Sequence, residues 1–154
     1  MSLILSIETS SQKCFVALHD QGRLIAASQS EEEGAHAKKL TLLIEEVVKK
    51  AATKLGALVG IAISIGPGSY TGLRIGLATA KGLCFGLDKP LIAVPTLKIL
   101  AARHADSTEH QILIPVMDAR RMEVYTAIYT HDLQELEPAN ALILDELSFA
   151  AYQE

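Results

Sequence analysis

Tryptophan is absent from this chain of 154 residues, and aromatic side chains of any kind make up only 5% of it. A platform on which single-stranded bases stack is therefore not expected. Positive charge is also scarce, because 14 Lys and Arg residues are outnumbered by 18 Asp and Glu residues, which gives a formal net charge of -4. The chain lacks the basic composition that favours polyanion binding, so any RNA involved in its function would be held mainly by another protein.

Cysteine is represented only by Cys14 and Cys84, which form neither a CxxC pair nor a Cys/His cluster. Both are predicted to be reduced thiols that behave as small apolar residues, as in a reducing compartment. The N-terminus has no basic segment followed by an apolar one, and charged residues, glycines and prolines interrupt the apolar stretch from Leu73 to Leu100. A cytoplasmic protein without a membrane span is therefore predicted.

Several common catalytic and cofactor motifs are missing as well. There is no GxxxxGK[ST] loop, no GxGxxG, no HExxH and no GxSxG. The 5 histidines include no pair at an i, i+4 spacing, so a metal site on one helix face is not expected. These absences predict a chain without catalytic residues and without a set of metal ligands.

A regular succession of apolar strands and helices is present. Apolar runs separated by brief polar turns predict an antiparallel meander of strands at 3–7, 14–19 and 23–28. The elements expected next are a helix from His36 to Leu55 with Gly56 as C-cap, a buried strand from Val59 to Ile65, a helix from Thr71 to Leu87, a strand from Leu91 to Val94, and a helix to His104 with Thr96 as N-cap. This succession predicts an α/β fold with a mixed sheet, in which an antiparallel meander is followed by parallel strands flanked by helices.

The pattern restarts after residue 106, which predicts two domains, residues 1–106 and residues 107–154. The second is expected to contain a strand at 112–117, a turn at Asp118–Arg121, strands at 123–129 and 141–144, and the start of a helix at 145–152. It would be the beginning of another α/β lobe that the chain does not complete. The turn could also expose the guanidinium groups of Arg120 and Arg121 to phosphate or carboxylate.

A glycine-rich segment, residues 66–72, joins the buried strand to the following helix. It could be a tight turn that lets strand and helix pack closely, or its amides at the helix N-terminus could bind an anion. Glu8, at the end of the first strand, could likewise be an acid beside a ligand crevice or part of a capped turn. The candidate anion-binding or nucleotide-binding residues are Glu8, Thr9, Ser10, Gly66, Gly68, Ser69, Thr71, Gly72 and Arg74.

The helix from Thr71 to Leu87 is apolar on nearly every side, and only Arg74 and Lys81 carry charge within it. A helix of this kind must be covered all round. One side can pack on the sheet. The other side must be covered either by the preceding helix or by another chain, and the sequence leaves both alternatives open.

Four segments resemble the TsaB (YeaZ) family. They are Ile-Glu-Thr-Ser at 7–10, Gly-Ala-His-Ala at 34–37, Gly-Pro-Gly-Ser-Tyr-Thr-Gly-Leu-Arg-Ile-Gly-Leu-Ala at 66–78 and Asp-Ala-Arg-Arg at 118–121. The resemblance implies the ribonuclease-H-like fold of actin, sugar kinases and Hsp70. It also implies a non-catalytic subunit of the bacterial machinery that attaches threonylcarbamoyl to the adenosine beside the anticodon in tRNAs reading codons that begin with A.

The same resemblance implies partners. The chain would bind and stabilise a catalytic TsaD-like subunit, assemble with a TsaE-like ATPase, form a homodimer when alone, and meet tRNA only through the complex. No intrinsic cofactor is expected, although ATP or ADP could bind at the partner interface. The residues expected at that interface are His36, Leu40, Leu43, Val47, Leu73, Gly76, Leu77, Ala80, Lys81 and Cys84, and Leu77→Asp is expected to disrupt it.

Two features of the resemblance bear on catalysis. TsaD-like proteins carry a metal-binding HxxxH on the helix corresponding to 36–55, whereas this chain has His36 followed by Leu40. Members of the family usually have two full lobes, and the second one here is short.

The alternatives are an active ATP-dependent phosphotransferase or glycoprotease-type peptidase of the same fold, which would need a metal-bound nucleotide near Glu8, and a self-associating regulatory domain with another partner.

Overall fold

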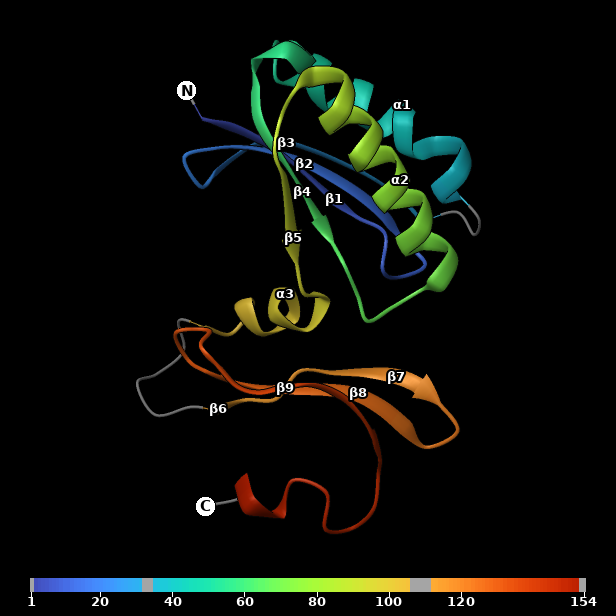
Figure 1. Cartoon of the computed structure of the whole chain (residues 1–154), viewed down its shortest axis with the longest axis vertical. Coiled ribbons are helices and arrows are strands. Elements are labelled where there is room, and N and C mark those ends of the chain that lie inside the picture. The colour runs from blue at the N-terminus through green and yellow to red at the C-terminus, as the bar shows by residue number, and fades with distance from the viewer. Residues whose placement is uncertain (1, 32–34, 106–111, 153–154) are drawn as a thin grey trace. The chain divides into compact units, whose positions relative to one another are not determined.

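The computed structural model describes residues 2–31, 35–105 and 112–152, with the side chains of residues 35–37 and 151 outside the description (Figure 1). The chain divides into two compact units, Met1–Val94 and Pro95–Glu154. The division falls before the last helix of the expected first domain, whereas the sequence analysis placed the domain boundary at residue 106.

The first unit is built on a five-stranded sheet with the order β3-β2-β1-β4-β5. Its strands are β1 (Leu3–Glu8), β2 (Cys14–Asp20), β3 (Arg23–Ser30), β4 (Leu58–Ser64) and β5 (Leu91–Val94). The first three form an antiparallel meander, and β4 and β5 run parallel to β1. This arrangement confirms the mixed sheet that the short polar turns and apolar runs predict.

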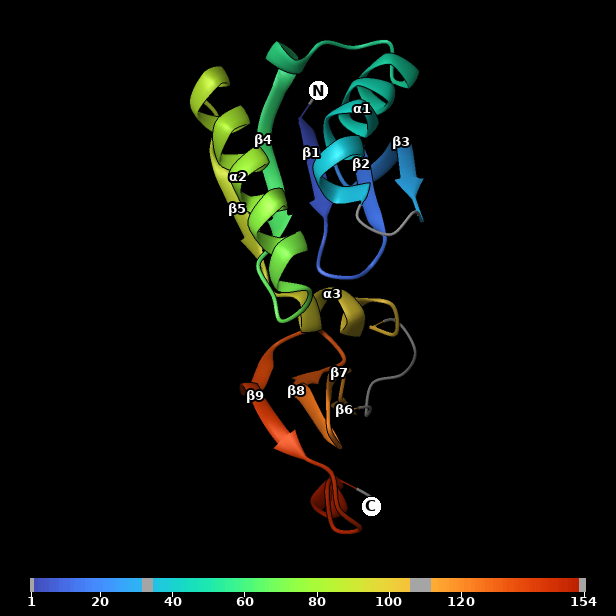
Figure 2. The same ribbon diagram turned by 90° about the vertical axis from the view of Figure 1, so that its right-hand side faces the viewer.

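Two helices, α1 (Ala35–Lys50) and α2 (Tyr70–Leu87), cover one face of this sheet (Figure 2). α1 packs on β2 and β3, and α2 packs mainly on β4. Side chains alternate along β1, so that Leu3, Leu5 and Ile7 are buried in the core of the unit. The core that fixes both helices is therefore a single apolar layer between them and the sheet.

The first helix ends earlier than predicted, at Lys50 instead of Leu55. The amide of Ala52 donates to the Lys49 carbonyl and that of Thr53 to the Val48 carbonyl, with Ala52 in the left-handed region at φ 49°. These are the two hydrogen bonds of a Schellman motif, a C-terminal cap in which glycine is the usual left-handed residue. Gly56, the cap predicted from the sequence, instead lies in a short 3-10 turn.

The second unit contains one α-helix and a small antiparallel sheet in the part of the chain that the structure describes. The elements are α3 (Thr96–Ala102), β6 (Ile112–Leu113), β7 (Val116–Arg120), β8 (Glu123–Thr130), β9 (Glu135–Ile143) and a 3-10 turn, η2 (Ala150–Tyr152). β8 pairs with β6, β7 and β9. The N-cap of α3 is Pro95, so Thr96 is the first helical residue and not the cap that the sequence analysis assigned.

Four further predictions for this unit are wrong. The strand expected at 112–117 is divided at Pro115, which has no amide to donate to a sheet. The hairpin turn follows Arg120, whereas the sequence analysis began it at Asp118. β9 starts at Glu135 in place of residue 141, and a 3-10 turn stands where a helix was expected.

Across residues 2–31, 35–105 and 112–152, no helix combines the length and apolar character that crossing a membrane requires.

Candidate functional site

Glu8, at the end of β1, holds together the ends of two neighbouring strands. Its Oε1 accepts a hydrogen bond from the Ser10 amide at 2.6 Å and another from the Ser64 hydroxyl at 2.9 Å. Ser64 is the last residue of β4 and is buried. The carboxylate is thus engaged in capping the turn after β1, which matches the capped-turn alternative for Glu8.

The glycine-rich segment lies directly against this turn. The Ser69 amide donates to the Ser10 carbonyl at 2.6 Å. A Cβ atom added at Gly68 or at Gly72 would come within 3.0 Å of a backbone oxygen, of Ser10 or of Thr9 respectively, closer than real Cβ atoms approach. The absence of side chains here therefore permits backbone-to-backbone contact between β1's turn and α2.

The N-terminus of α2 uses its own polar groups. Ser69 is the N-cap, and its hydroxyl accepts a hydrogen bond from the Gly72 amide at 3.2 Å. The Leu73 amide donates to the Ser69 carbonyl at 2.8 Å. Two amides that a phosphate could use are therefore already satisfied within the segment.

The structure brings together most, but not all, of the candidate anion-binding residues. Glu8, Thr9 and Ser10 lie against the glycine-rich segment, as described above. Arg74 instead lies on the exposed side of α2, where its guanidinium stacks over the Tyr70 ring at 4.1 Å from the centroid. Thr71 is exposed as well. Nucleotide binding stays a prediction.

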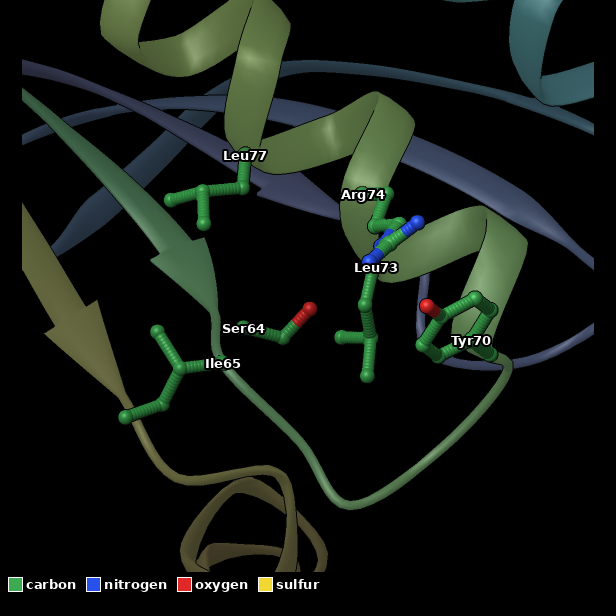
Figure 3. A pocket seen from close by; sticks show the side chains of 6 residues that line it. All are labelled: Ser64, Ile65, Tyr70, Leu73, Arg74 and Leu77. Carbon is green, nitrogen blue, oxygen red and sulfur yellow. The ribbon is translucent and has the colours of Figure 1, made fainter.

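A small pocket opens beside this segment, at the carboxyl end of β4 (Figure 3). Its volume is about 140 Å³. The lining residues are Ser64, Ile65, Tyr70, Leu73, Arg74 and Leu77. Ile65, Leu73 and Leu77 form the aliphatic part of the lining, and Arg74 is the one cation in it.

The side chains of α1 that were expected at a partner interface are buried in their own unit. Leu40, Leu43 and Val47 are 1%, 6% and 0% exposed and belong to the core. They are therefore not presented on the surface of this unit, and their apolar spacing reports packing on the sheet. His36 lies in α1, but its side chain is outside the described part of the chain.

The expected interface residues of α2 are divided among three sides of the helix. Gly76 and Ala80 are buried against the sheet, and an added Cβ at Gly76 would meet the Thr9 hydroxyl. Leu73, Leu77 and Cys84 are half-buried, and only Lys81 is exposed. Of this set, only Lys81 lies on the exposed side of the helix.

The exposed side of α2 carries apolar residues that the sequence analysis did not select. We call it the α2 outer face, defined as Tyr70, Arg74, Ala78, Lys81 and Phe85, all of which are exposed. Phe85 is 93% exposed and Tyr70 is 69% exposed. The two charged residues of the helix could have located this face, because Phe85 follows Lys81 by one helical turn.

The remaining candidate features are the hairpin arginines, the two cysteines and the metal-ligating side chains. The Asp118 carboxylate accepts a hydrogen bond from the Arg120 amide at 2.7 Å, and Arg120 and Arg121 both have positive φ at the exposed hairpin. Burial raises the pKa of the Cys14 thiol, with a smaller contribution from the charge of Glu8, and burial also raises the pKa of Cys84. Both thiols therefore stay protonated at neutral pH. The described residues include no group of three His, Cys, Asp or Glu side chains placed to hold a metal.

Comparison with known proteins places this arrangement in a family. The family model of TsaD, described as tRNA N6-adenosine threonylcarbamoyltransferase, matches residues 26–151. The tRNA threonylcarbamoyladenosine biosynthesis protein TsaB of Bacillus subtilis is 34% identical over 150 residues, which cover 94% of this chain and 64% of that protein. The chain spans 51% to 66% of the length of the curated relatives it matches.

Solved structures agree with this assignment. YeaZ from Pseudomonas aeruginosa is 31% identical, with a TM-score of 0.84 over 95% of this chain and 70% of that one. A ROK hexokinase from Thermus thermophilus, only 14% identical, has a TM-score of 0.52 over 87% of this chain and 48% of its own. The sugar kinase likeness confirms the predicted actin-like fold. The chain belongs to the TsaB (YeaZ) family.

Proposed function

We propose that this chain is a non-catalytic partner subunit in the threonylcarbamoylation of the adenosine next to the anticodon in tRNAs reading codons that begin with A. It binds and stabilises a TsaD-like catalytic subunit through the α2 outer face. The observation that carries the proposal is the exposure of Phe85, at 93%, on the outer face of a helix whose opposite side packs on the sheet. Burial of a phenylalanine side chain against a partner contributes about 1.5–3 kcal/mol, which is enough to make this residue an anchor.

The first helix supports the non-catalytic part of the proposal. The resemblance implies that catalytic TsaD-like subunits hold a metal with an HxxxH pair on this helix. Here the second position is Leu40, which is 1% exposed within the core. A leucine offers no ligand atom, so that metal pair does not form on α1.

The wider assembly follows from the same proposal. In isolation, two copies would cover their α2 outer faces by forming a homodimer, and the TsaD-like subunit would replace one copy in the complex. The TsaE-like ATPase would join that complex. The chain's formal net charge of -4 favours contact with tRNA through the other subunits.

Reconstitution of the modification tests the proposal. The TsaD-like and TsaE-like proteins, the threonylcarbamoyl donor and a tRNA reading codons that begin with A are incubated with and without this chain. We expect omission of the chain to lower the initial rate of modification at least about tenfold, because the catalytic subunit then loses its partner. Full activity without the chain would contradict the proposal. Turnover of ATP or of a peptide by this chain alone would favour the phosphotransferase or peptidase alternative.

A further inference from the structure

We propose that the pocket beside Arg74 is an anchor site that receives one apolar side chain from an acidic segment of the TsaD-like subunit. This inference rests on the proposed function, because it names a specific contact within the proposed interface. The pocket belongs wholly to the first unit, between the end of β4 and the first turns of α2 (Figure 3).

The volume of the pocket fits a single amino-acid side chain better than a nucleotide. Its volume is about 140 Å³. Small-molecule sites generally enclose about 300–1,000 Å³, so the pocket is too small for a whole nucleotide but suits one leucine or phenylalanine side chain. The nearby amides of Gly72 and Leu73 are engaged by Ser69, which leaves them without a free hydrogen for a phosphate.

The walls of the pocket are suited to an apolar occupant. Leu73 and Leu77 of α2 line the pocket on one side, and Ile65, the residue that follows β4, also lines it (Figure 3). Ser64 and Tyr70 each contribute a hydroxyl to the lining. The Ser64 hydroxyl donates to Glu8 at 2.9 Å, and Tyr70 is 69% exposed. An apolar side chain can therefore enter without leaving the buried Ser64 hydroxyl unpaired.

The positive charge of Arg74 at the pocket favours an acidic residue next to the side chain that the partner inserts. The guanidinium of Arg74 stacks on Tyr70 at 4.1 Å, and no carboxylate of the described residues pairs with it. Stacking on the Tyr70 ring fixes the orientation of the guanidinium. A guanidinium is planar and can bind a carboxylate through two parallel hydrogen bonds. A carboxylate close to the anchoring side chain of the partner would complete this contact.

The pocket is continuous with the proposed interface. Tyr70 and Arg74 belong both to its lining and to the α2 outer face that carries Phe85. Arginine and tyrosine are enriched among the residues that contribute most to binding energy at interfaces. The anchor site and Phe85 would thus engage the partner along one side of α2.

Titration of the cognate TsaD-like protein by isothermal calorimetry tests this inference. We expect Arg74→Ala to raise the Kd about tenfold or more by removing the charge, and Ile65→Phe to do the same by filling the pocket. Arg23→Ala, which removes an exposed arginine at the start of β3, is the matched control and should change the Kd less than about twofold. Ile65 is 51% exposed, so Ile65→Phe should leave the circular dichroism melting curve nearly unchanged.

The outcomes separate the two proposals. If the wild-type chain does not bind the TsaD-like protein, the proposed function is wrong and the anchor site falls with it. If the wild type binds, and Arg74→Ala and Ile65→Phe both bind within about twofold of it, the anchor site alone is wrong. Binding of ADP to the isolated chain that Arg74→Ala removes would assign the pocket to a nucleotide and overturn the inference.

Discussion

Replacement of Gly72 by alanine is expected to lower the free energy of unfolding of the Met1–Val94 unit by about 3 kcal/mol. The new Cβ would come within 3.0 Å of the Thr9 carbonyl oxygen, which is a backbone atom and not the end of a flexible side chain. The turn that carries this oxygen is fixed on both sides, by the Glu8 carboxylate and by the Ser69 amide. Relief of the overlap would therefore require α2 to move away from the sheet.

Gly82→Ala in the same helix is the matched control. A Cβ at Gly82 would meet no atom within 4 Å, so alanine should stabilise the helix by about 0.5–1 kcal/mol through its higher helix propensity. Urea unfolding followed by far-ultraviolet circular dichroism measures both variants, since the chain contains no tryptophan for fluorescence. Equal stabilities for the two variants would show that the glycine-rich segment does not pack as the structure has it.

The variant Phe85→Asp is expected to weaken binding of the TsaD-like protein at least about thirtyfold, which corresponds to about 2 kcal/mol or more. A carboxylate at this position would be desolvated in the interface without a partner, and the apolar contact of the ring would be lost. The variant should also remain monomeric at concentrations at which the proposal predicts a homodimer of the wild type. Its unfolding temperature as a monomer should hardly change, because the Phe85 ring is 93% exposed.

A control with the same chemistry separates this effect from a general loss of apolar surface. Leu147 is 77% exposed and belongs to the second unit, so Leu147→Asp removes an exposed apolar side chain that is not part of the α2 outer face. Its Kd should stay within about twofold of the wild type. Comparable weakening by both variants would argue against the α2 outer face as the binding surface. The Leu77→Asp variant is a poorer test, because Leu77 packs against the core.

The order of strands in the first unit could be predicted because local signals agree with the fold. Short polar turns at 9–13 and 21–22 leave no room for a crossover, so the meander follows directly. The end of α1 could not be predicted, because Ala52 adopts the left-handed conformation that is usually assigned to glycine. β9 was underestimated because Pro138 and the acidic residues around it are unusual in a strand. Glu135 and Glu137 nevertheless pair with β8, and Pro138 lies at a shift of register between the two strands.

The candidate site could be predicted only in part, for a related reason. The motifs place Glu8 beside the glycine-rich segment, and the structure brings them together. The apolar periodicity of α1 and α2 shows where each helix has an apolar side, but it does not show which side the sheet already covers. Leu40 was therefore expected at an interface and lies in the core, whereas Phe85 was overlooked and is exposed.

Size-exclusion chromatography with multi-angle light scattering, on this chain alone and mixed with the cognate TsaD-like protein, tests the partner-subunit proposal most directly. The proposal predicts a homodimer of about twice the 16.6 kDa chain mass that exchanges into a one-to-one complex when the TsaD-like protein is added. Phe85→Asp should abolish both species. A wild-type chain that elutes as a folded monomer and leaves the TsaD-like peak unchanged would contradict the proposal.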